Sequence, residues 1–106
     1  MTDLASKNCI SCEGDMSPMS EDQIGEQLKH IEGWEYIEGE LVRIYTFKNY
    51  YQTVAFVNAA AWIAHQEDHH PDIEFGYKTC RIRYSTHAIG GISENDFICA
   101  AKINAL

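Results

Sequence analysis

The chain has 106 residues, of which 45% are hydrophobic, and it carries 16 acidic against 8 basic residues for a formal net charge of -8. This length suits one domain with a modest core, to which self-association would add stability. The negative charge argues against binding to nucleic acid or to anionic membranes, and no apolar run reaches the roughly 20 residues that span a bilayer.

The N-terminal residues predict a flexible arm. Residues 1–18 are mostly small and polar without an apolar period, so the domain is expected to cover residues 19–106. The start of the chain lacks the basic and hydrophobic regions of a signal peptide, which predicts a cytoplasmic protein whose cysteines stay reduced. Cys9 and Cys12 form a C-x-x-C pair in the arm, of the kind that can be redox-active or half a zinc site, but no second pair lies nearby.

The first half of the domain reads as a helix, a hairpin and a second helix. Ser20 and Gln23 form a capping-box pattern that predicts a helix over residues 21–31. Two runs rich in β-branched and aromatic residues, 34–37 and 41–47, flank a polar break that contains glycine and predict a hairpin. Residues 50–68 contain no Gly or Pro and carry apolar residues at helical spacing, which predicts a long helix ahead of Pro71.

The second half predicts another hairpin and a last helix. Apolar and polar residues alternate over 73–77 and 80–84, with a turn near Lys78 and Tyr77 packing on the sheet. Ser93 and Asp96 then repeat the capping pattern ahead of the final helix. The order α-β-β-α-β-β-α predicts an α+β fold, a four-stranded antiparallel sheet with three helices on one face. The other face and the sheet edges would remain available to a second copy.

The densest group of chemically active side chains is the segment 65–71, which reads His-Gln-Glu-Asp-His-His-Pro at the end of the long predicted helix. An antiparallel return strand would bring His87 back beside His69 and His70, so three imidazoles could share one cleft. Neighbouring imidazoles titrate in a coupled way, which supplies a base and an acid near neutral pH. The group therefore predicts a site for proton transfer.

Two other interpretations of these histidines stay open. Adjacent histidines in a polar turn are often a solvated surface pair. His65 and His69 are also four residues apart on a helix, so both could face zinc with His70 or His87 as a third ligand. The glutamate of a zincin would directly follow the first histidine, whereas Gln66 stands there, so no metal is expected.

The spacing of these residues resembles the signature of the pterin-4a-carbinolamine dehydratases. The matching positions are His65, His69-His70-Pro71, Tyr77, His87 and Asp96, with Gly33-Trp34, Asp68, Ser85-Thr86 and Gly90-Gly91 around them. The resemblance extends over about residues 20–103. It implies that the domain as a whole belongs to this family.

The resemblance implies dehydration of 4a-hydroxytetrahydrobiopterin to quinonoid dihydrobiopterin, which recycles the pterin cofactor of aromatic amino acid hydroxylases. One proton goes to the departing hydroxyl at C4a and one leaves N5, so neither a metal nor a redox cofactor is expected. By the same resemblance, His69 and His87 are the expected acid and base. His70 is expected to orient the pterin and to assist.

Further substrate contacts follow from the resemblance. Trp34 is expected either in the pterin pocket or in the hairpin core, and Asp68 either orients an imidazole or is a solvated charge at a helix end. Ser85 and Thr86 are expected to contact the substrate. Asp96 is explained by the helix start that it caps, so a structural role is expected for it.

The expected partners, besides the pterin, are other copies of the chain in a homodimer or homotetramer and an aromatic amino acid hydroxylase. A second hypothesis is an interaction protein, because vertebrate relatives also act as dimerisation cofactors of a transcription factor through helix surface. Nothing in the sequence identifies such a partner.

Overall fold

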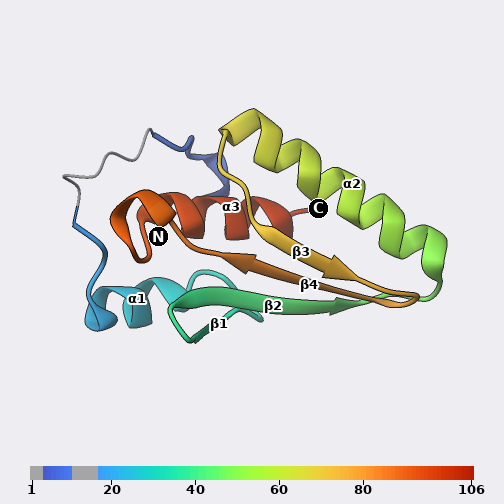
Figure 1. The fold of residues 1–106 in the computed structure, drawn as a ribbon, viewed down its shortest axis with the longest axis horizontal. Helices are drawn as coiled ribbons and strands as arrows, with labels where there is room; N and C mark the ends of the chain where they lie inside the picture. The colour runs from blue at the N-terminus through green and yellow to red at the C-terminus, as the bar shows by residue number, and fades with distance from the viewer. Residues whose placement is uncertain (1–3, 11–16) are drawn as a thin grey trace.

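The computed structural model describes residues 4–10 and 17–106 and arranges them as a sheet with helices packed on it (Figure 1). The main elements, in chain order, are α1 (Glu21–Leu28), β1 (Glu35–Ile37), β2 (Glu40–Thr46), α2 (Tyr50–Glu67), β3 (Asp72–Phe75), β4 (Thr79–Tyr84) and α3 (Glu94–Asn104). Two short 3-10 turns, η1 (Leu4–Ser6) and η2 (His87–Ile89), precede α1 and α3. The predicted α+β fold and order of elements are therefore confirmed. No helix in the two described ranges is long and apolar enough to cross a membrane.

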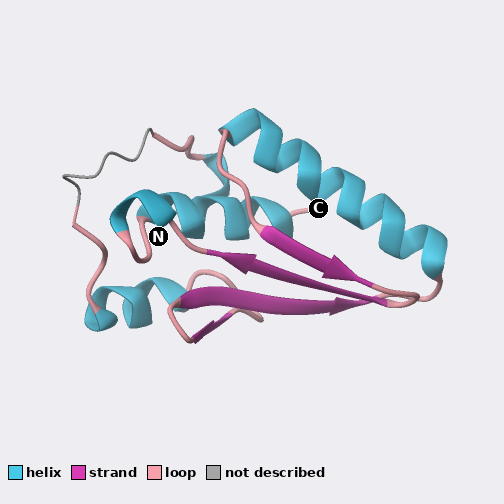
Figure 2. Ribbon diagram, viewed as in Figure 1, coloured by secondary structure: helices cyan, strands magenta, loops and turns pink. Residues whose placement is uncertain are grey.

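The strands form one antiparallel sheet in the order β1-β2-β4-β3, so the two predicted hairpins meet along β2 and β4. Side chains alternate across β4, where Cys80, Ile82 and Tyr84 are buried and Arg81 is exposed on the opposite face. Helices α2 and α3 lie over the buried face (Figure 2). Ile24 of α1 belongs to the same core.

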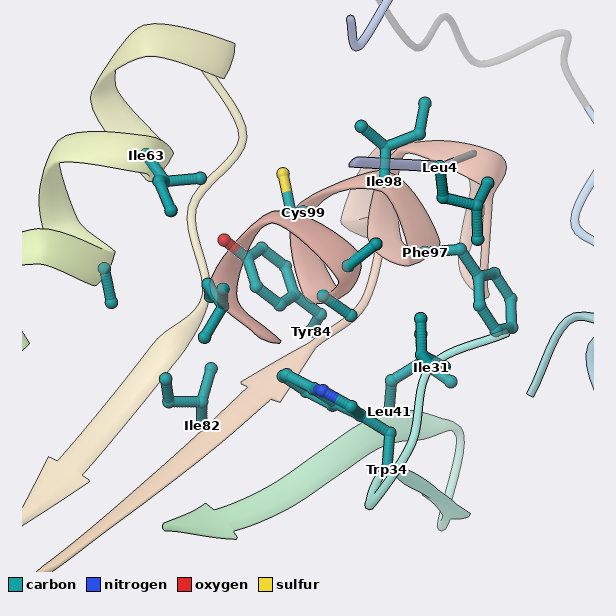
Figure 3. Close-up of a cluster of buried hydrophobic side chains, with 14 of the residues drawn as sticks. Leu4, Ile31, Trp34, Leu41, Ile63, Ile82, Tyr84, Phe97, Ile98 and Cys99 are labelled. Atoms are coloured by element: carbon teal, nitrogen blue, oxygen red, sulfur yellow. The ribbon is translucent and has the colours of Figure 1, made fainter. Parts of the chain in front are cut away.

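The core is centred on Tyr84 and Phe97, both completely buried, and Figure 3 shows them among side chains from β2, β4 and α3. Helix α3 is the most deeply buried helix, since residues 95–101 are all buried. Its first turn carries two polar side chains, Asn95 and Asp96, into this environment. Buried polar groups need hydrogen-bond partners, so the first turn of α3 must be tied to the elements around it.

The helix starts follow the predicted caps. The Ser20 hydroxyl accepts a hydrogen bond from the Gln23 backbone N at 3.2 Å, and the Gln23 side chain accepts one from the Ser20 backbone N at 2.9 Å. A second capping box begins α3. The end of α1 differs from the prediction, because the helix stops at Leu28 and the chain turns to bring Ile31 into the core.

Helix α2 ends where Asp68 adopts a left-handed backbone with φ 51°, directly before the two neighbouring histidines. Since such a conformation cannot continue a helix, the chain leaves α2 there, ahead of Pro71. One detail of the next hairpin was predicted wrongly. Strand β3 ends at Phe75, and Tyr77 lies in the turn with 66% of its surface exposed, so it does not pack on the sheet.

The N-terminal residues depart from the predicted arm where they are described. Residues 4–10 lie against α3, with Leu4 only 3% exposed and Lys102 Nζ donating to the Ala5 carbonyl oxygen at 2.8 Å. The domain boundary at residue 19 thus leaves out a segment that contributes to the core. A single leucine makes no periodic pattern, so the sequence does not predict this docking. Cys12 of the C-x-x-C pair lies outside the described residues.

Candidate active site

A pocket of about 520 Å³ opens where the ends of α2 and β4 meet the start of α3. The sheet register explains this meeting, because Asp72 at the start of β3 pairs with Arg83 near the end of β4. The residues just before β3 and just after β4 are thereby brought side by side. His69, His70 and His87 line this one pocket, as their spacing predicts.

His69 is the most constrained of these histidines. Its side chain is 12% exposed, and its Nε2 lies 2.6 Å from Oδ1 of Asp96. Its ring stacks on that of Tyr84, with centroids 5.5 Å apart and planes 7° from parallel. Burial alone would lower the pKa of His69, but the hydrogen bond and the negative charge of Asp96 outweigh it and raise the pKa above the usual value. His69 is therefore suited to hold a proton near neutral pH.

The Asp96 carboxylate is completely buried and joins three segments of the chain. Besides His69, it accepts hydrogen bonds from the Thr86 hydroxyl at 2.7 Å and from the Ser93 backbone N at 2.9 Å. The predicted structural role at the helix start is therefore present. The same carboxylate also holds His69, a contact between residues 27 positions apart that no local pattern signals.

Two of the predicted substrate contacts, Thr86 and Trp34, are buried and make hydrogen bonds inside the protein. Thr86 borders the pocket, but it is 3% exposed and its hydroxyl donates to Asp96 inside the protein. Trp34 is 5% exposed in the core (Figure 3), and its Nε1 donates to Oδ1 of Asn104 at 2.9 Å. Because Trp34 does not line the pocket, the expectation of a pterin-pocket role is corrected in favour of the core role.

The remaining predicted residues lie at the pocket with more exposure. His70, His87 and Asp68 are exposed, and Ser85 is half-buried. The carboxylate that is hydrogen-bonded to Nε2 of His69 is Asp96 and not its sequence neighbour Asp68. The Asp68 charge makes only a small contribution to raising the pKa of His69.

His65 lies apart from the other residues of the zinc alternative. His65 is exposed, with its ring 5.3 Å from that of Trp62, and it does not line the pocket. Across residues 4–10 and 17–106, no group of three or more His, Cys, Asp or Glu side chains is placed to hold a metal ion.

Other pocket residues had no predicted site role. Cys9 and Ile10 come from the N-terminal segment, Glu67 from the end of α2 and Asn95 from the first turn of α3. Glu67 Oε1 accepts a hydrogen bond from the Cys9 backbone N at 2.7 Å, which holds the segment at the pocket. Cys9 and Ile10 could not be found from sequence, because their position depends on the docking of residues 4–10. Glu67 lies inside the predicted histidine segment 65–71, but no local pattern signals its contact with Cys9.

Comparison with known proteins gives a consistent result. Residues 17–106 match a family model described as Pterin 4 alpha carbinolamine dehydratase. A protein of Nitrosospira multiformis is 58% identical to this chain, over 98% of this chain and 92% of its own length. A protein of Nitrosomonas eutropha is 55% identical, over 98% of this chain and 93% of its own length. A Legionella pneumophila protein is 50% identical over 99% of this chain and 96% of its own length. All three bear the name putative pterin-4-alpha-carbinolamine dehydratase.

Two solved structures share the fold. A transcriptional coactivator/pterin dehydratase from Brucella melitensis superposes with a TM-score of 0.80 at 28% identity, covering 84% of this chain and 97% of its own. A pterin dehydratase-like protein identified as a RuBisCO assembly factor in the alpha-carboxysome superposes with a TM-score of 0.61 at 26% identity. The match covers 72% of this chain and 90% of that protein. The fold therefore serves proteins whose names include both catalytic and assembly roles.

Proposed function

This chain belongs to the pterin 4 alpha carbinolamine dehydratase family, and from that membership we propose that it converts 4a-hydroxytetrahydrobiopterin to quinonoid dihydrobiopterin and water. The family and its named relatives make the protein an enzyme of the hydro-lyase class. The reaction breaks the bond between C4a and its hydroxyl, removes the proton on N5 and forms a double bond between C4a and N5. It needs one proton donor and one proton acceptor in the same pocket.

The observation that carries the catalytic part of the proposal is the contact between His69, which lines the pocket, and the buried carboxylate of Asp96. In our proposal His69 is the general acid that protonates the departing hydroxyl. Its raised pKa keeps the proton available near neutral pH, and the Asp96 carboxylate stabilises the imidazolium. Because Asp96 holds Nε2, the ring atom that exchanges the proton with the substrate is Nδ1.

His87 is the proposed base that takes the proton from N5. It lines the same pocket as His69 but comes from η2, after β4, so the two imidazoles approach a bound pterin from different segments. His70 follows His69 directly and is the proposed orienting residue. Positioned proton transfer typically contributes a factor of about 10² to 10⁴ in rate, and this is the scale expected of the histidines together.

The cellular part of the proposal is recycling of the cofactor of an aromatic amino acid hydroxylase in the cytoplasm by a homodimer or homotetramer. Self-association is supported by the sheet face opposite the helices, where Ile44 is 60% exposed. Light scattering coupled to size-exclusion chromatography measures the molar mass in solution and so tests the proposed self-association. A monomer at all concentrations would contradict it.

The test of the catalytic proposal is stopped-flow ultraviolet absorbance of 4a-hydroxytetrahydrobiopterin formed in situ by a hydroxylase. The wild-type protein should accelerate its decay, and His87→Ala should lose most of that acceleration. His65→Ala is the matched control, since His65 is also an exposed histidine but lies outside the pocket. No acceleration by the wild type would refute the function. Equal loss in both variants would refute the site.

A further inference from the structure

The N-terminal strap, defined as residues 4–10, is held against the pocket by side chains that the proposed reaction does not use. Asn95 makes two hydrogen bonds to the backbone of Ile10. Its Oδ1 accepts one from the Ile10 N at 3.0 Å, and its Nδ2 donates one to the Ile10 carbonyl oxygen. Glu67 accepts from the Cys9 N at 2.7 Å. These contacts fix the backbone on both sides of the Cys9 side chain, which therefore has a defined position.

The Cys9 side chain in that position meets a second thiol. Its Sγ lies 3.5 Å from Sγ of Cys99, which is completely buried in α3. Cys9 is half-buried and lines the pocket, so one member of the pair is reachable from solvent. A disulfide needs an S–S separation of about 2.05 Å, so an approach of about 1.5 Å would join them.

The surroundings stabilise a negative charge on Cys99, whereas the hydrogen bond to Cys99 and burial raise the pKa of Cys9. The hydrogen bond from Cys9 lowers the pKa of Cys99 despite its burial, and the nearby Tyr84 hydroxyl and the charge of His69 act in the same direction. Figure 3 shows the Cys99 sulfur and the Tyr84 hydroxyl on the same side of the core. The thiolate is the reactive form of a cysteine, so Cys99 is the sulfur of this pair that the surroundings activate as a nucleophile.

We propose that Cys9 and Cys99 are a peroxide-sensitive thiol pair that forms a disulfide and thereby locks the N-terminal strap onto α3 beside the pocket. The oxidant is a hydroperoxide, with hydrogen peroxide as the simplest member. This site is separate from the proposed dehydration chemistry, because neither thiol exchanges a proton with the pterin.

The proposed oxidation takes place in two steps. The Cys9 thiol, which lines the pocket, gives its proton to the neighbouring Cys99 thiolate as its sulfur attacks one oxygen of hydrogen peroxide. The O–O bond breaks and the leaving hydroxide takes that proton from Cys99, so that a sulfenic acid and one water result and Cys99 is again a thiolate. The Cys99 thiolate then attacks the Cys9 sulfur, the S–O bond breaks, and the hydroxide that leaves takes up a proton as a second water. In total, two thiols and one hydrogen peroxide give one disulfide and two waters, and a thiol reductant reverses the change.

The first experiment treats the full-length protein with one equivalent of hydrogen peroxide, alkylates the remaining thiols and maps the tryptic peptides. The expected product is a cross-link between peptides 8–29 and 84–102. Since peptide 8–29 also contains Cys12, the Cys12→Ser variant should keep the cross-link and Cys9→Ser should lose it. Cys80, a completely buried cysteine of β4, is the internal control and should be recovered reduced.

The second experiment measures whether the strap is locked. Trypsin cleavage after Lys7, which lies within the strap, requires the strap to leave the domain. Oxidation should slow this cleavage by about tenfold or more, and a reductant should restore it. Pairing of Cys9 with Cys12, a cross-link between separate molecules, or full alkylation of Cys99 after peroxide would each overturn the proposal. None of these readouts depends on dehydratase activity, so they test the thiol pair even if the proposed function fails.

Discussion

Replacing Asp96 by Asn tests the central contact of the site. Asp96 accepts hydrogen bonds at 2.6 Å from His69, at 2.7 Å from Thr86 and at 2.9 Å from Ser93. An asparagine can keep one accepting oxygen, but its amide nitrogen only donates. If that oxygen stays with Ser93, the amide faces Nε2 of His69, which must then be neutral in order to accept. The substitution therefore removes the charge that holds the His69 proton.

The expected loss of stability follows from the same contacts. A hydrogen bond to a charged group contributes about 1.5–3 kcal/mol, so Asp96→Asn should lower the free energy of unfolding by about that amount. Because the folded-state pKa of His69 is raised, the protonated pair contributes stability that is fully present below about pH 6.5. This stability is lost as the pH rises through the folded-state pKa, so the effect of the variant should be larger at pH 6 than at pH 9.

Urea unfolding followed by tryptophan fluorescence, at both pH values, measures this difference. The stopped-flow assay should show a fall in rate of about 100-fold near neutral pH, and the alkaline limb of the rate profile should move to lower pH. Asp68→Asn is the matched control for stability, because Asp68 is an exposed carboxylate beside His69 and asparagine tolerates its left-handed backbone. An unchanged pH profile together with equal destabilisation at both pH values would refute the reasoning.

Two further predictions concern the fold around the site. Trp34→Phe removes the hydrogen bond to Asn104 and should lower the free energy of unfolding by about 1–2 kcal/mol, with kcat unchanged. A folded variant that has lost activity would show that Trp34 reaches the pterin. Gly33→Ala should cost about 1–3 kcal/mol in urea unfolding, because the backbone there has φ 87° and the new methyl would meet the Arg43 side chain. Gly25→Ala is its control, in an exposed part of α1 with open space around it, and should instead raise stability by about 0.5–1 kcal/mol.

The elements of this fold were predictable from the sequence because they depend on neighbouring residues. The Ser20–Gln23 and Ser93–Asp96 patterns satisfy backbone groups within one helical turn, so they mark helix starts in any tertiary context. Strand alternation and short turns specify the hairpins in the same way. The antiparallel return of β4 then brings His87 to the two histidines at the end of α2, which is why the pocket itself was predictable.

The partner of each side chain was not predictable, because it depends on how separate elements pack. Asp68 is the sequence neighbour of His69, but its own backbone turns out of the helix, and the docking of α3 brings the Asp96 carboxylate to the imidazole instead. Cys9 and Ile10 likewise reach the pocket because Leu4 packs against α3 and because Glu67 and Asn95 bind their backbone. The sequence by itself thus determined the elements, their order and the meeting of the histidines, through short-range backbone geometry. Only the tertiary structure decided the carboxylate that holds His69, the core position of Trp34 and the thiol that faces Cys9, since each depends on side chains brought together by packing.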